Sequence, residues 1–202
     1  MALDLLGQAR FWLGYAGDED KLAFLRDASA FRNALLVEQP NGDYALTTAR
    51  QFYFDAWHDL VLEKMQYSSD ERIAAIAAKA RKEVIYHLER SADWVIRLGD
   101  GTEESHARMQ KALDALWMYT GELFEMDAVD REMLQRGIGP NLAALREPWI
   151  EQVRKTLNEA TLQIPSGTWM QRGGRQGIHT EKLGYLLAEM QFLQRAYPGA
   201  RW

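Results

Sequence analysis

Hydrophobic residues recur at helical spacing along most of the chain. This pattern predicts helices over residues 2–16, 44–67, 70–98, 103–126, 141–163 and 179–196, with an interruption or kink at Pro148 in the fifth. The second helix has hydrophobic positions on two faces, so we expect it to pack on more than one side. We find no convincing run of alternating hydrophobic and polar residues, which a strand would require. The sequence therefore predicts an all-α protein.

The joins between these helices predict how they are connected. Most are short, which favours antiparallel neighbours, whereas residues 18–43 form one long connection that ends in the turn sequence Gln39–Asp43. In a helical bundle, a long crossover allows two successive helices to run parallel. We expect one helical domain over residues 1–202, with a crossover loop and extra C-terminal helices.

Composition excludes several classes of function. The chain has 202 residues and no cysteine, so it has no disulfide framework, thiolate zinc site, iron–sulfur cluster or cysteine nucleophile. Its 24 basic and 29 acidic residues give a net charge of −5, which does not favour nucleic acid or an anionic membrane as a partner. No apolar run has the length of a membrane span, and residues 1–4 lack the features of a signal peptide. We expect a cytoplasmic protein.

Residues 165–177 form the one glycine-rich, locally basic segment. They match neither a phosphate-binding loop nor a dinucleotide fingerprint, and the chain has no nucleophile elbow. An ordered connection that uses glycine at positive φ is one interpretation. A contact with a partner or an anion is the other, with these candidate residues: Trp169, Arg172, Gly173, Gly174 and Arg175.

Metal chemistry in a helical bundle is the remaining possibility. A di-iron carboxylate site takes one Glu from each of two helices and a Glu-x-x-His pair from each of two others. The chain has three acid–histidine pairs: Asp55 with His58, Glu83 with His87, and Glu103 with His106. The last lies at the exposed start of a helix, and the second is spaced by four residues. Each pair is also typical of ordinary polar contacts, and together they do not make two ligand sets.

Several segments resemble one known family. They are Leu3–Arg10, Leu35–Gly42, Ala49–Gln51, Asp55–His58, Lys82–Glu83 with Tyr86–Leu88, Gly177–Gly184 and Leu187–Gln191. In this order they resemble the C subunits of ring 1,2-phenylacetyl-CoA epoxidases (phenylacetate-CoA oxygenases), which are bacterial multicomponent monooxygenases of phenylacetate catabolism. The resemblance covers essentially the whole chain.

The resemblance implies a ferritin-like helical bundle that supports a catalytic subunit. In such complexes the A subunit holds the di-iron centre, other subunits deliver electrons and aid assembly, and the C subunit lacks a working centre. Leu5 and Gln8 stand where a catalytic relative would have a carboxylate and an imidazole, and Tyr86 follows Glu83 at the histidine spacing. We therefore interpret the following positions as a metal-free remnant: Leu5, Gln8, Asp55, His58, Glu83 and His87. No catalytic or cofactor-binding residue is expected in this chain.

The resemblance also implies that the first bundle helix is missing, because relatives carry further helical residues ahead of the Leu3–Arg10 segment. We expect the uncovered apolar surface to drive homo- or hetero-oligomer formation. Two other interpretations stay open. One is an independent di-iron oxidase or oxygenase with Asp55, His58, Glu83 and His87 as ligands. The other is a free-standing helical module for an acyl thioester, with only Arg172 and Arg175 available for CoA phosphates.

Overall fold

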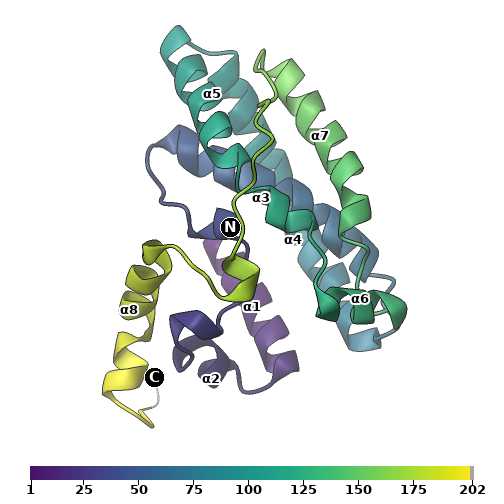
Figure 1. Cartoon of the computed structure of the whole chain (residues 1–202), viewed down its shortest axis with the longest axis vertical. Helices are drawn as coiled ribbons and strands as arrows, with labels where there is room; N and C mark the ends of the chain where they lie inside the picture. The colour runs from purple at the N-terminus through teal and green to yellow at the C-terminus, as the bar shows by residue number, and fades with distance from the viewer. Residues whose placement is uncertain (201–202) are drawn as a thin grey trace. The chain divides into compact units, whose positions relative to one another are not determined.

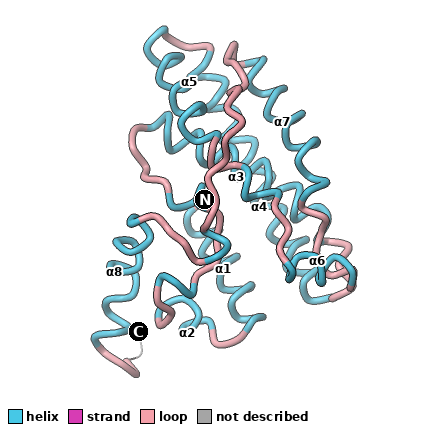
Figure 2. The backbone as a smooth tube through the Cα atoms, viewed as in Figure 1, coloured by secondary structure: helices cyan, strands magenta, loops and turns pink. Residues whose placement is uncertain are grey.

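The computed structural model describes residues 1–200 and is built of helices joined by loops (Figure 1). No strand occurs in these residues, as the secondary-structure colouring shows (Figure 2). The predicted all-α class is confirmed. The chain divides into two compact units, here called unit 1 (Met1–Pro40 and Arg172–Trp202) and unit 2 (Asn41–Gln171). The expectation of one domain over the whole chain stays a prediction.

Unit 2 is built on two long helices that pack against each other, α3 and α4. Both also contact α5 and α7, so the four helices share one core. The elements of unit 2 are α3 (Tyr44–Met65), α4 (Glu71–Gly99), α5 (Glu103–Trp117), η3 (Gly121–Phe124), α6 (Ala128–Gln135), η4 (Ala143–Leu145) and α7 (Arg146–Glu159). In Figure 1 they run from blue through teal to green.

Polar side chains set the starts of the long helices. Asp43 caps α3 by accepting a hydrogen bond from the Leu46 N–H at 2.9 Å. Asp70 caps α4 by accepting from two backbone N–H groups, and Thr102 forms a capping box with Ser105 at α5. These acceptors satisfy N–H groups that have no partner inside the helix, and each such cap contributes about 1 kcal/mol.

An aromatic cluster joins the helices of unit 2. The ring of Trp149 on α7 lies 5.6 Å from those of Tyr53 on α3 and Trp117 on α5, and 5.3 Å from that of Phe124. The Trp149 indole N–H also donates to the Tyr53 carbonyl at 3.0 Å. Because each ring contacts a different element, the cluster positions α5, α7 and η3 on α3.

The structure corrects three expectations about unit 2. The helix predicted over 103–126 ends at Trp117, whose carbonyl accepts from Thr120, and a separate 3-10 turn follows. The predicted interruption or kink at Pro148 is also wrong. This proline lies in the first turn of α7, where a missing N–H breaks no helical hydrogen bond. Helix α6 was not expected, although Asp127 and Asp130 form a capping box at its start.

Unit 1 is made of short elements between two longer helices, α1 and α8. Its elements are α1 (Ala2–Ala16), α2 (Glu19–Phe24), η1 (Ala28–Ala30), η2 (Leu35–Glu38), η5 (Gly174–Gln176) and α8 (Glu181–Ala196). The long connection predicted over 18–43 thus holds α2 and two 3-10 turns. Helix α2 contacts both α1 and α8. Gln191 and Arg195 of α8 donate to the backbone carbonyls of Ala23, Phe24 and Arg26, at the end of α2 and just after it.

The glycine-rich segment is an ordered part of unit 1. Gly173 and Gly177 have φ angles of 137° and 84°, which favour glycine over any residue with a side chain. At Gly174 a Cβ atom would collide with the carbonyl oxygen of Asn33. These glycines therefore let residues 173–177 pack against the 29–35 segment.

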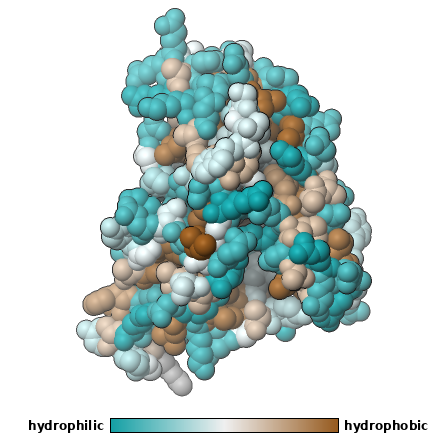
Figure 3. Space-filling view, viewed as in Figure 1, coloured by the Kyte–Doolittle hydropathy of each residue, from teal (hydrophilic) through white to brown (hydrophobic). Residues whose placement is uncertain are grey.

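The surface is mixed in character. On the face shown in Figure 3, hydrophilic residues cover most of α5, whereas apolar residues gather over α8. Six large apolar side chains of the α8 region are exposed: Tyr185, Leu186, Met190, Phe192, Leu193 and Tyr197. None of the described helices is long and apolar enough to cross a membrane.

A tight helix contact in unit 2 gives a test of the fold. A Cβ atom at Gly99, the last residue of α4, would lie 2.8 Å from both the Ala160 Cβ and the Leu162 Cδ1. We expect Gly99→Ala to lower the free energy of unfolding by about 1–3 kcal/mol because it overpacks this contact. Urea unfolding measures the effect.

Gly184→Ala is the matched control, because Gly184 is interior to α8 and nothing lies within 4 Å of its added Cβ. This change should be neutral or should stabilise the protein by up to about 1 kcal/mol. Equal effects of the two substitutions would contradict the close packing of α4.

Candidate functional site

A buried polar cluster lies in unit 2 where α3 packs on α4. The α3–α4 polar cluster consists of Gln51, Asp55 and His58 on α3, and of His87 and Ser91 on α4. Within each helix these residues are three or four apart, so they share one face. Asp55 and His87 have no exposed surface, and Ser91 is buried. Such a set of polar groups in a helical core requires partners for every charge.

The Asp55 carboxylate has a protein donor on each oxygen. Its Oδ1 accepts a hydrogen bond from the Gln51 Nε2 at 2.6 Å, and its Oδ2 accepts from the Ser91 hydroxyl at 2.9 Å. Burial raises the pKa of Asp55 to about 6, although these hydrogen bonds and the nearby His87 favour the charged form. The carboxylate is therefore held by two neutral side chains of the same core.

His58 is neutral at physiological pH. Burial lowers its pKa to about 4, and repulsion from His87 acts in the same direction. Its ring packs on Phe54 at 5.2 Å between centroids and stacks on Trp57 at 6.3 Å. The His58 Nδ1 is buried and has no hydrogen-bond partner among the described residues. His58 thus contributes aromatic packing, while its Nδ1 makes no hydrogen bond to the described residues.

Of the other proposed remnant positions, Glu83 is at the margin of this cluster and two belong to unit 1. Glu83 is one helical turn before His87 and is only partly buried, and Tyr86 is exposed. Leu5 and Gln8 share one face of α1 in unit 1, where Gln8 is buried. Within unit 2 the structure thus brings together Asp55, His58 and His87.

The cluster does not fit a di-iron centre. Such a centre needs several carboxylate oxygens free to bind metal, whereas both oxygens of Asp55 accept hydrogen bonds from Gln51 and Ser91. Among the described residues, no group of three or more acidic or histidine side chains converges as metal ligands would. That this chain holds no metal in solution stays a prediction.

The Glu103–His106 pair has a structural role. His106 Nδ1 lies 2.7 Å from the Gly99 carbonyl oxygen, so this nitrogen donates to the end of α4. Glu103 is exposed in the first turn of α5. His106 therefore serves the α4–α5 junction, whereas Glu103 is exposed to solvent.

A second buried polar cluster lies in unit 1, around Glu38. Its Oε1 accepts from the Asn33 side chain at 2.8 Å and pairs with His179 Nδ1 at 2.6 Å. Its Oε2 accepts from the Thr180 backbone N–H and hydroxyl at 2.8 and 2.9 Å. The remaining His179 nitrogen lies 3.1 Å from the Phe31 carbonyl oxygen. His179 therefore links the Glu38 carboxylate to the backbone of the segment that precedes it.

This pair joins segments that are far apart in the sequence. Burial by itself would raise the pKa of Glu38, but hydrogen bonds from Thr180, His179 and Asn33 together hold it below its ordinary value. Neither residue of the pair was assigned a role from its sequence pattern. Glu38 and His179 do lie in two of the segments that carry the family resemblance.

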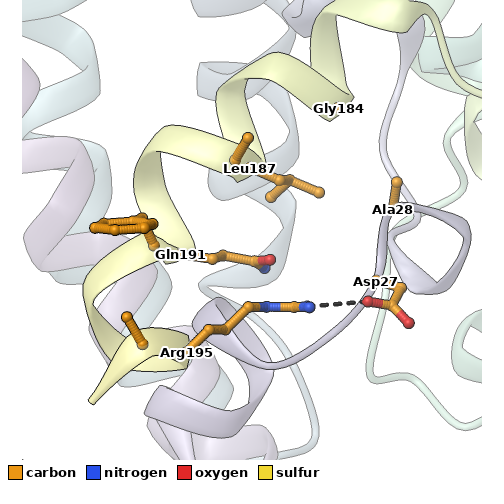
Figure 4. Close-up of a pocket in the computed structure, with 9 residues that line it drawn as sticks. Asp27, Ala28, Gly184, Leu187, Gln191 and Arg195 are labelled. Carbon is orange, nitrogen blue, oxygen red and sulfur yellow. Dashed lines mark hydrogen bonds and ion pairs between the residues drawn. The ribbon is translucent and has the colours of Figure 1, made fainter. Parts of the chain in front are cut away.

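The largest of the described pockets is in unit 1, and its charged side chains pair with each other. In unit 1, a cavity of about 530 Å³ lies between α8 and residues 27–28 (Figure 4). Its two charged residues, Asp27 and Arg195, pair with each other at 3.0 Å. Gln191, on the same wall, donates to the carbonyls of Ala23 and Arg26. The polar groups of this pocket therefore stabilise α2.

The predicted partner contacts differ in exposure. Trp169 is 63% exposed, and Arg172 is also exposed. Gly173 and Gly174 are buried and Arg175 is partly buried. Contact with a partner stays a prediction, for which Trp169 and Arg172 present the most surface.

Comparison with known proteins gives the relationships of the chain. A family model described as "Phenylacetic acid catabolic protein" matches residues 1–202. The chain is also similar to the C subunit of the 1,2-phenylacetyl-CoA epoxidase of Escherichia coli (strain K12). The two are 49% identical over 208 residues, which cover 100% of this chain and 84% of that protein. The predicted family resemblance and the ferritin-like, all-α class are confirmed.

The raised pKa of Asp55 predicts a pH dependence of stability. Between about pH 4 and 6 the folded protein keeps a proton on Asp55 that the unfolded chain releases. The stability of the wild type relative to Asp55→Asn should therefore fall by roughly 2–3 kcal/mol as the pH rises through this range. Urea unfolding at a series of pH values measures the difference. A difference that is independent of pH would show that Asp55 is not a desolvated acid.

The Glu38–His179 pair predicts a large effect on stability. Glu38→Gln should cost about 3 kcal/mol at pH 7 because it removes a buried carboxylate whose two oxygens face donors of Asn33, His179 and Thr180. The pKa of Glu38 in the folded protein is lower than its ordinary value of 4.5. The difference in unfolding free energy between wild type and variant should therefore have its full size above about pH 4.5 and should shrink as the pH falls below that value.

Glu181→Gln is the control, because Glu181 is two residues after His179 in the sequence but is exposed and pairs with the surface Lys182. It should change the free energy of unfolding by less than about 0.5 kcal/mol. Similar losses in both variants would argue against a stabilising role of the buried Glu38 carboxylate.

Proposed function

The chain belongs to the family of phenylacetic acid catabolic proteins, and we propose that within it the chain is a non-catalytic subunit of a phenylacetyl-CoA epoxidase. In this proposal it supports a separate di-iron subunit that oxidises the aromatic ring of the thioester. The chain holds no cofactor itself. Its similarity to the C subunit of the E. coli epoxidase supports its placement in a multisubunit assembly.

The main support for the proposal is that both oxygens of the Asp55 carboxylate accept hydrogen bonds from protein side chains. A carboxylate that binds iron needs a free oxygen lone pair directed at the metal, with imidazole and other carboxylates around it. Here the donors directed at Asp55 are the Gln51 amide and the Ser91 hydroxyl. These side chains supply in neutral form the contacts that a cation would otherwise make.

The residues of α1 support the same conclusion. Leu5 has no ligand atom, and the amide of Gln8 is a poor ligand for iron compared with imidazole. An independent di-iron oxidase would need Glu83 and His87 to complete a ligand set with Asp55 and His58. Glu83 is partly exposed, and it lies four residues before His87, whereas the di-iron motif has a spacing of three. No observation therefore favours that alternative.

Exposed apolar surface supports a role in assembly. The six exposed side chains of the α8 region lie on or directly after one helix of 16 residues, and contiguous apolar surface of this kind is typical of protein interfaces. A partner subunit or a second copy of the chain would bury it. By contrast, no described pocket combines several cations as a CoA-binding module would require.

Reconstitution with the catalytic subunit of the same epoxidase tests the proposal. We expect the chain to form a stable complex with that subunit and to raise its rate of phenylacetyl-CoA oxidation, while showing no oxidation alone. His58→Gln and Asp55→Asn should support turnover within about twofold of the wild type, because neither residue takes part in the chemistry.

Variant folding is checked by circular dichroism, and binding is measured separately from turnover. Oxidation by the chain alone would contradict the proposal. So would a variant that binds normally but abolishes turnover, because that result would place the α3–α4 polar cluster in the reaction.

A further inference from the structure

A pocket of unit 2 lies beneath the loop that carries Trp169. The Trp169 pocket, about 420 Å³ in volume, is bounded by the C-terminal half of α5 and by residues 163–169. Two indole side chains line it, Trp117 from the helix and Trp169 from the loop. Asp114 of α5 lines it as well. All of these residues belong to the same compact unit.

The loop is fastened to α5 before Trp169. The Gln110 side chain bonds both backbone groups of Gln163, accepting from its N–H at 2.8 Å and donating to its carbonyl at 3.1 Å. The indole N–H of Trp117 then donates to the Gly167 carbonyl at 3.1 Å. These three hydrogen bonds hold residues 163–167 in one conformation along the helix.

The loop is fastened again after Trp169. The Gln171 N–H donates to the Met118 carbonyl at 2.8 Å, and Met170 packs so closely on Gly121 that no side chain would fit there. Trp169 is thus presented between two anchored stretches of backbone while 63% of it stays exposed. Anchoring of the backbone on both sides limits the positions that the Trp169 side chain can take, and an aromatic side chain has few rotatable bonds. It therefore loses little conformational entropy on binding, which is typical of interface hot spots.

The charge of the pocket defines its ligand. Asp114 is the one ionisable residue among those that line it, and it is exposed. Its Oδ1 accepts from Gln110 at 3.0 Å, and no ion pair within residues 1–200 involves it. Lys111, one turn earlier on α5, does not line the pocket. A single carboxylate beside two indoles attracts a cation and repels the phosphates of a CoA thioester.

We infer that the Trp169 pocket receives a cationic side chain, an arginine, from the catalytic subunit with which the chain assembles. The planar guanidinium stacks on an indole face and presents two N–H donors to the Asp114 carboxylate at once, which a lysine ammonium cannot do. This inference rests on the proposed function, because it names the contact through which part of that assembly forms.

Binding of full-length variants to the catalytic subunit tests the inference, with dissociation constants measured by calorimetry. Trp169→Ala should weaken binding at least about tenfold, and Trp169→Phe should recover part of the loss because it keeps an aromatic face. Asp114→Asn should weaken binding about fivefold and should reduce the dependence of affinity on salt.

Tyr67→Ala is the matched control, because Tyr67 is an exposed aromatic residue of unit 2, with 83% of it exposed, that does not line the pocket. It should bind within about twofold of the wild type. Thermal unfolding of each variant checks that the exposed substitutions leave the fold intact.

The outcomes separate the inference from the proposed function. Wild-type binding with no loss in Trp169→Ala and Asp114→Asn overturns the inference and leaves the proposed function standing. A loss in Trp169→Ala alone overturns the cationic ligand, because an apolar contact would then suffice. If the wild type does not bind the catalytic subunit, both the proposed function and the inference fail.

Discussion

A buried carboxylate is the constraint on which the core of unit 2 depends. Asp55 lies in the middle of α3, with no exposed surface, where α3 meets α4. A charge in this position must be compensated, since an isolated buried carboxylate is strongly unfavourable. Gln51 and Ser91 provide that compensation from the two facing helices, so the acid both requires and fixes their packing. In a di-iron relative the corresponding charge would be balanced by metal.

Unit 1 compensates its buried acid differently. Glu38 contacts the His179 ring and accepts three further hydrogen bonds from Asn33 and Thr180. This arrangement lowers the pKa of Glu38, whereas the neutral donors of Asp55 leave its pKa raised. Stability arising from Glu38 is thus lost in acid, while burial of Asp55 opposes folding once its carboxyl ionises. The two buried acids therefore contribute to the pH dependence of stability in opposite directions.

The long helices could be predicted from the sequence because each carries many repeats of the hydrophobic pattern and a clear cap. Helix α2 could not, since six residues contain fewer than two turns. The helix predicted over 103–126 is too long because Leu123 and Phe124 continue the helical spacing inside a 3-10 turn. Asp55, His58 and His87 could be found from their spacing on facing helices. The Glu38–His179 contact spans 141 residues, which no local pattern reveals.

We propose that protein groups, rather than iron, satisfy the buried acids of this chain. The most direct measurement is the iron content of the full-length protein, grown with excess iron and also reloaded with Fe(II) without oxygen before desalting. A content near zero under both conditions is the predicted result. A content of about two irons per chain would contradict this proposal, because it would make Asp55, His58, Glu83 and His87 ligands of a working centre.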